Sequence, residues 1–181
     1  MSFIKLSETV APPTPAAGLV ELFVDVASRL SQIDDAGTVT VFAAEPGTGA
    51  VVQNSPADPT GTTTSGMMGL ASVITPVTTG RIHVTITGTI ANATAIADGA
   101  NVQLRTGTGT PPANAAALTG TVAGGLVKYV AATTAEKAPF TVCAIVTGLT
   151  LNTARWIDLG LAAVIGGTAT VKDLSVTAFE F

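Results

Sequence analysis

Few side chains in this sequence have the chemistry that catalysis requires. The 181 residues include one histidine, His83, and one cysteine, Cys143. A serine hydrolase would need a nucleophile, a base and an acid brought together, often announced by a G-x-S-x-G turn, and the sequence contains no such turn. His83 alternates with Arg81 and Thr85 on the polar side of an expected strand. We therefore expect it to face solvent or a subunit interface.

The acidic residues do not form a convincing catalytic pair. Asp34 and Asp35 are adjacent, so their side chains point to opposite sides of an extended backbone, and we expect them to accept hydrogen bonds from turn amides instead. The other acids are scattered singly. Gly107-Thr108-Gly109 lacks the lysine and helix of a phosphate-binding loop. His83 has no second strong metal ligand near it, so we expect no metal site. Because no triad, acid pair or phosphate-binding loop is present either, we also expect no enzymatic activity and no cofactor.

Three further residues have a chemical and a structural interpretation. Trp156 and Tyr129 could stack on a sugar ring, but a single Trp beside Arg155 in a strand is more typical of a core or a subunit contact. Cys143 follows the phase of Thr141 and Ile145, and we expect a buried or half-buried small residue there.

The elements that carry these residues are predicted to be strands. Residues 81–90 alternate apolar and polar side chains, which predicts a half-buried strand with a core face. That face consists of Ile82, Val84, Ile86 and Ile90. Further strands are expected at residues 69–75, 102–106, 126–131, 140–146, 155–165 and 170–181, separated by joints rich in Gly, Pro and Asn. The pattern favours a β-sandwich or jelly-roll, and the alanine-rich residues 112–118 allow at most a turn or two of helix.

The last strand is expected to run to the end of the sequence. In residues 171–181, Leu174, Val176 and Ala178 share one face. The other face carries Ser175, Thr177, Phe179 and Phe181.

The N-terminal third predicts a small β-meander at residues 19–42. Residues 19–24 and 29–33 are short strands, Asp34-Asp35-Ala36-Gly37 is a turn, and residues 38–42 form the third strand. A sheet of that size buries little surface, and domains below roughly 40 residues usually need disulfides, metal or oligomerisation. One cysteine excludes an internal disulfide, so we expect partner chains.

The resulting organisation has four parts. Residues 1–18 form an extended Pro-rich arm, 19–42 the meander, 43–66 a Gly/Pro/Thr linker, and 67–181 the β-sandwich. Contact with partner chains is assigned to the apolar meander residues: Leu19, Leu22, Phe23, Val24, Leu30, Ile33, Val39 and Val41. Anchoring to another protein is assigned to the arm: Phe3, Ile4, Leu6, Pro12, Pro13 and Pro15.

The segment P-x-P-A-A-G-x-V-x-L-F-V-D-x-x-x-R-L-x-x-x-D-D-A-G-T-V, about 30 residues, carries a family resemblance. It resembles the short module at the base of many tailed-bacteriophage fibre and spike proteins, in which three chains wrap around one another below a C-terminal β-domain. The resemblance implies a homotrimer with an intertwined meander, so that the apolar meander residues given above serve trimerisation. It also implies that the arm residues given above anchor the trimer to a capsid or another partner. The strand at residues 171–181 is similar to the closing strand of trimeric jelly-roll tips in phage fibres.

Composition agrees with a buried, assembled surface. Charged residues are 11% of the chain against about 25% in ordinary globular domains, and mean hydropathy is +0.54. The longest apolar stretch, residues 159–165, is far shorter than the roughly 20 residues that span a bilayer, and no secretory signal core is present, which disfavours a bacterial adhesin or pilus-like subunit. The basic residues are never adjacent, which argues against nucleic-acid binding.

These observations predict a virion structural protein made in a host cytoplasm, where a single cysteine stays reduced. Two roles remain open. The trimer could decorate and cement the capsid by binding the major capsid protein or another virion protein. Alternatively, it could be a short tail fibre or tip whose β-sandwich binds a host receptor such as a surface glycan.

Overall fold

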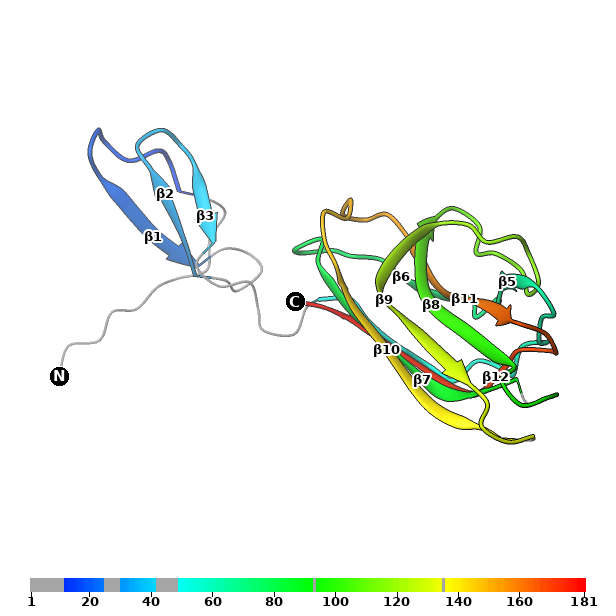
Figure 1. The fold of residues 1–181 in the computed structure, drawn as a ribbon. Helices are drawn as coiled ribbons and strands as arrows, with labels where there is room; N and C mark the ends of the chain where they lie inside the picture. The colour runs from blue at the N-terminus through cyan, green and yellow to red at the C-terminus, as the bar shows by residue number, and fades with distance from the viewer. Residues whose placement is uncertain (1–11, 25–29, 42–48, 93, 135) are drawn as a thin grey trace. The chain divides into compact units, whose positions relative to one another are not determined.

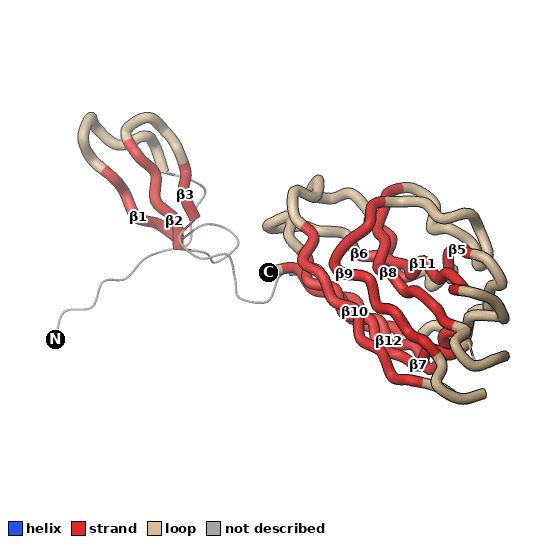
Figure 2. Tube along the Cα trace, viewed as in Figure 1, coloured by secondary structure: helices blue, strands red, loops and turns tan. Residues whose placement is uncertain are grey.

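The computed structural model describes residues 12–24, 30–41, 49–92, 94–134 and 136–181, and their regular elements are all strands (Figures 1 and 2). The chain divides into two compact units, Met1–Thr48 and Gly49–Phe181. We refer to them as the N-terminal and C-terminal units and describe each by itself. The predicted all-β fold is confirmed.

The N-terminal unit contains a three-stranded antiparallel sheet with the order β1-β2-β3. Its strands are β1 (Val20–Val24), β2 (Leu30–Asp34) and β3 (Val39–Val41). Asp34 closes the β2–β3 turn, where its Oδ1 accepts hydrogen bonds from the backbone N–H groups of Ala36 (3.0 Å) and Thr38 (2.8 Å). Asp35 Oδ2 accepts one from Gly18 N–H (2.6 Å). The two acids therefore bind backbone amides, as expected.

The C-terminal unit packs two antiparallel sheets on each other. One has the order β10-β7-β12-β4, and the other has the order β5-β11-β8-β9, with β6 also pairing with β11. The strands are β4 (Val51–Asn54), β5 (Ser65–Met67), β6 (Ser72–Ile74), β7 (Ile82–Ala91), β8 (Gly99–Thr108), β9 (Thr121–Val130), β10 (Ala138–Val146), β11 (Arg155–Val164) and β12 (Thr170–Glu180). Figure 1 shows the two layers, and one hydrophobic cluster draws residues from both.

The core follows the alternation in the sequence. Ile82, Val84, Ile86 and Ile90 of β7 are buried, as are Leu174, Val176 and Ala178 of β12. The β12–β7 pairing shifts register between Lys172 and Ser175, and Asp173 has a positive φ of 54° there. The bulge keeps the apolar residues of β12 on the core side despite the extra residue.

The predicted linker at residues 43–66 is too long at its C-terminal end. The C-terminal unit begins at Gly49, and β4 pairs with β12 in the register Val52 to Ala178. β5 pairs with β11, and Thr62 forms a bridge with Ala169. The turn-forming residues in this segment separate the short strands β4 and β5. These strands form without a long apolar run because they are held by backbone pairing to β12 and β11.

Other boundaries and one burial prediction also change. The expected strand at 69–75 shortens to β6, because Gly69 and Ala71 both have positive φ (70° and 52°). Residues 112–118 form no helix. Cys143 was expected to be buried or half-buried but is exposed. In β10 the residues that point inward are Phe140, Val142 and Ala144, so Cys143 lies on the outer face.

Candidate functional site

The outer face of the four-stranded sheet carries an apolar row that crosses all four strands. The β-sheet register aligns Ile145 of β10 with His83 of β7, His83 with Phe179 of β12, and Phe179 with Val51 of β4. Val51, Ile145 and Phe179 are exposed, and His83 is half-buried. We call these four residues together with Phe181 the apolar row. An exposed apolar cluster that crosses several strands is a candidate contact surface.

Ring contacts organise this row. The rings of His83 and Phe179 have centroids 5.2 Å apart, and those of Phe179 and Phe181 are 6.4 Å apart in an edge-to-face arrangement. The Arg81 guanidinium lies 4.8 Å above the Phe181 ring, a cation–π geometry. His83, Ile145, Phe179 and Phe181 line a shallow hollow of about 280 Å³. The arrangement offers ring faces and one positive charge, which suits contact with an apolar or ring-shaped surface.

Glu180 fixes the end of β12 between the two phenylalanines. Its Oε1 accepts hydrogen bonds from the backbone N–H groups of Thr78 (2.9 Å), Thr79 (2.6 Å) and Gly80 (2.9 Å). Its Oε2 accepts from Val77 (2.8 Å) and Ala50 (3.3 Å). Although burial raises the pKa of a carboxyl, the hydrogen bonds from residues 77–80 prevail and hold the pKa of Glu180 far below its usual value. The carboxylate therefore binds the β6–β7 loop to the last strand.

The N-terminal unit also presents an apolar surface. Leu19, Leu22 and Val39 are 59%, 50% and 45% exposed, and Val20 is exposed as well, while the register places Val39 on the sheet face opposite Val20 and Leu22. In contrast, Phe23 and Ile33 are each only 4% exposed within this unit. Val20 and Leu22 lie two residues apart on β1 and so share one face of the strand. This face has no cover within the described part of the unit.

The residues that we assigned to trimerisation thus fall into two groups. Leu19, Leu22 and Val39 are available for contact, whereas Phe23 and Ile33 are buried inside the unit and Val24 is half-buried. The side chains of Leu30 and Val41 lie outside the description. Among the anchoring residues, Pro12 and Pro15 are half-buried and Pro13 is exposed, while Phe3, Ile4 and Leu6 lie outside the described residues.

The candidate chemical residues have structural partners. Trp156 is buried and donates its Nε1–H to Thr108 O (3.1 Å), and buried Tyr129 donates its hydroxyl to Glu136 O (2.9 Å). The prediction that Trp156 belongs to the core or a contact, not to a sugar site, fits this burial. Within the described ranges, no group of three or more His, Cys, Asp or Glu residues could hold a metal ion.

Two parts of the site were missed by sequence reasoning. The alternation placed Phe179 and Phe181 on one face, but it could not align them with His83 and Ile145, because cross-strand register is invisible in one sequence. Glu180 had no local signal, since its partners lie about 100 residues earlier.

Comparison with known proteins gives no family. No protein-family model matches the chain, and no curated protein sequence matches it. Over the residues with described structure, no helix is long and apolar enough to cross a membrane. We therefore infer a function from the apolar row and from the exposed apolar residues of the N-terminal sheet.

Proposed function

We propose that this chain is a structural, non-catalytic protein of a tailed-phage particle that acts as a homotrimer and decorates and cements the capsid surface. The observation that carries the proposal is the exposure of apolar side chains on the N-terminal sheet: Val20 and Leu22 share one face of β1, and Leu19 and Val39 are exposed outside that face. Three strands of five, five and three residues cannot bury enough surface to offset their ordering entropy. Contact with other copies of the sheet supplies the missing burial.

The low charge and the resemblance of the arm and meander support the same role. Exposed apolar side chains at a subunit contact contribute roughly 25 cal/mol for each Å² that they remove from water. A trimer places three such faces together. In this arrangement the arm residues Phe3, Ile4 and Leu6 would bind the major capsid protein or another virion protein, and the C-terminal unit would remain free of that contact.

A second role is favoured by the apolar row. Exposed phenylalanine rings, with Arg81 beside them, can pack against the C–H faces of sugar rings while the guanidinium donates to hydroxyl groups. In this alternative, the chain is a short tail fibre or tip that binds a host-surface glycan.

Particles that lack this protein distinguish the two roles. A cement binds the assembled shell and stabilises it by mass action, so its loss should lower the temperature at which genome is released, while adsorption to cells stays normal. Adding back the purified protein should restore heat resistance. Normal heat resistance together with lost adsorption would contradict the capsid role and favour the tail role.

A further inference from the structure

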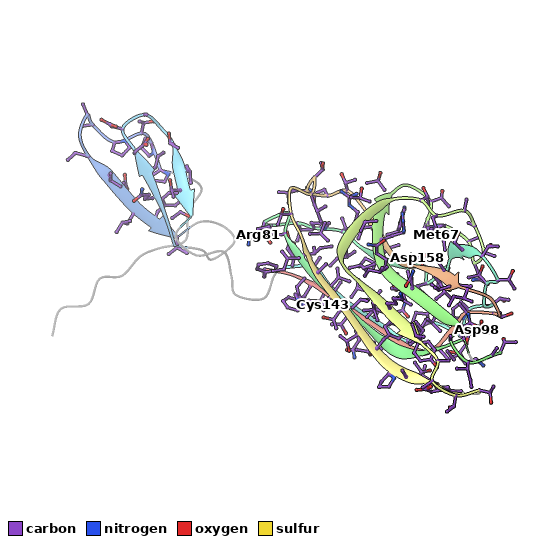
Figure 3. All side chains as sticks on the ribbon, viewed as in Figure 1. Met67, Arg81, Asp98, Cys143 and Asp158 are labelled. Carbon is purple, nitrogen blue, oxygen red and sulfur yellow. The ribbon has the colours of Figure 1, made fainter. Side chains whose placement is uncertain are left out.

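One cluster of oxygen atoms plays no part in the surfaces above. It is formed by the β7–β8 connection and the β11–β12 connection. Asn92 directly follows β7, Asp98 directly precedes β8, and Thr94 lies between them, while Gly166 and Gly167 belong to the other connection. In Figure 3 Asp98 lies at the end of the C-terminal unit opposite Arg81. The cluster is therefore remote from the apolar row.

The orientation of the Asn92 amide is fixed by its neighbours. Nδ2 donates hydrogen bonds to Gly99 O (2.7 Å) and Gly166 O (2.6 Å), so both amide hydrogens bind carbonyl oxygens. A flipped amide would place its oxygen against those two carbonyls, which the hydrogen-bond pattern excludes. Oδ1 consequently points the other way. The residue is 1% exposed, and Oδ1 is buried without a hydrogen-bond partner.

Two more oxygens gather at the same place. A Cβ atom built on Gly167 would lie 2.7 Å from Thr94 Oγ1 and 2.8 Å from Asp98 Oδ2, and it would also collide with Asn92 Oδ1. These three oxygens therefore lie close to one another against Gly167, which has a φ of 68° and carries no side chain that would separate them. Asp98 is itself buried, and its Oδ2 also accepts a hydrogen bond from Ala95 N–H (2.9 Å).

This arrangement puts a carboxylate and an amide oxygen face to face away from water. Both are hydrogen-bond acceptors, and a buried acceptor without a partner destabilises the folded chain. The Asp98 carboxylate already accepts from Ala95 N–H, but Asn92 Oδ1 receives no proton from Thr94 or from any other donor among the described residues. A cation bound among the three oxygens would satisfy all of them.

We propose that Asn92 Oδ1, Thr94 Oγ1 and Asp98 bind a Ca²⁺ ion, with water completing the shell. Ca²⁺ takes oxygen ligands at about 2.3–2.6 Å in flexible geometry, so oxygens that share one ion lie within about 5 Å of each other. Mg²⁺ is less suitable because it demands near-ideal octahedral geometry, and Zn²⁺ prefers nitrogen and sulfur. Because the set has one carboxylate, affinity should be weak, with a dissociation constant on the order of 1 mM.

Calcium titration of the full chain tests the proposal. After EDTA treatment and dialysis, thermal unfolding is followed in 10 mM CaCl₂ and in 10 mM MgCl₂, and binding is measured by calorimetry with CaCl₂. At tenfold the dissociation constant, Ca²⁺ should favour the folded state about 11-fold, which raises the melting temperature by about 3 °C. Mg²⁺ should have a smaller effect.

Three variants make the test specific. Asp98→Asn keeps an oxygen for the Ala95 N–H group but removes the charge, so the calcium effect should vanish. Thr94→Asp, at an exposed position, should tighten calcium binding about tenfold by adding a second carboxylate. Asp173→Asn is the matched control, since this exposed carboxylate accepts from Thr89 Oγ1 away from the cluster. Its calcium response should equal that of the unmodified chain.

The proposal is overturned if calcium neither binds nor stabilises the unmodified chain, because the oxygens are then satisfied by water. It is equally overturned if Asp98→Asn responds to calcium as the unmodified chain does. A Thr94→Asp variant without tighter binding would also contradict the proposed ligand set.

Discussion

Replacing Glu180 by glutamine should destabilise the chain far more than its small volume change suggests. In the structure Oε1 accepts from three backbone N–H groups and Oε2 accepts from those of Val77 and Ala50. A glutamine side chain has only one oxygen. If this oxygen takes the place of Oε1, the NH₂ group takes the place of Oε2 and faces the N–H groups of Val77 and Ala50. Two N–H groups then lose their acceptor, at about 1–3 kcal/mol each, so we expect Glu180→Gln to lose about 4 kcal/mol of unfolding free energy.

The pH dependence gives a second, independent signature. The folded-state pKa of Glu180 lies far below the usual value of 4.5, so ionised Glu180 stabilises the folded chain. This contribution is complete above pH 4.5 and declines as the pH falls below it, by at most about 1.4 kcal/mol per pH unit. The stability difference between the original chain and Glu180→Gln should therefore shrink between pH 5 and pH 3, as glutamine does not titrate.

Urea unfolding at pH 7, 5, 4 and 3 measures both effects. Glu21→Gln is the control, because Glu21 is an exposed glutamate on β1, and it should change stability by less than about 0.5 kcal/mol. A Glu180→Gln variant within about 0.5 kcal/mol of the original chain at pH 7 would refute the reasoning. So would a stability difference that stays constant down to pH 3.

Three further outcomes are expected. Ile86→Ala should lower the free energy of unfolding by about 2–5 kcal/mol because Ile86 is fully buried. Thr87→Ala, on the opposite face of β7, should change it by no more than about 0.5 kcal/mol. Equal losses in chemical unfolding would mean that both faces of β7 are covered. Burial raises the pKa of Asp158 despite the hydrogen bonds that it accepts from the backbone N–H groups of Leu159, Leu70 and Gly69. The ¹³C carboxyl signal of Asp158 should therefore show a pKa above the usual value of 3.8. A pKa at or below 3.8 would contradict this prediction. Acidification should accordingly remove a penalty at Asp158, opposite in sign to Glu180. Deleting the arm, residues 1–18, should leave a soluble trimer that no longer binds particles, and unchanged binding would place the anchor elsewhere.

The strands and their inward faces could be predicted from sequence because the alternation is a local property. Ile82, Val84 and Ile86 have this signal within ten residues, and the structure buries all three. The β4 and β5 strands were hidden, since their pairing with β12 and β11 depends on residues more than 90 positions away. Cys143 was placed correctly in phase with Thr141 and Ile145, but this face was expected to be buried or half-buried, because Cys143 and Ile145 are apolar and nothing local shows which face of β10 is covered.

The candidate site was predicted in composition but not in arrangement. The meander was expected to offer Leu19, Leu22 and Val39 for contact, and these side chains are exposed. Phe23 and Ile33 were given the same role, but they are buried. The sequence could not show this, because the rest of the unit determines which face of each strand is covered. The apolar row and the Glu180 contacts arise from cross-strand register, which a single sequence does not encode locally.

The mass of the purified chain in solution tests the central claim most directly. If the exposed apolar side chains of the N-terminal sheet, Leu22 among them, form a contact between copies, native mass spectrometry should give three times the 17.9 kDa chain. Leu22→Asp, which buries a charge in that contact but is solvated in a single chain, should dissociate the trimer, while Ile145→Asp in the apolar row should leave it intact. A stable, folded monomer of the unmodified chain would contradict the account.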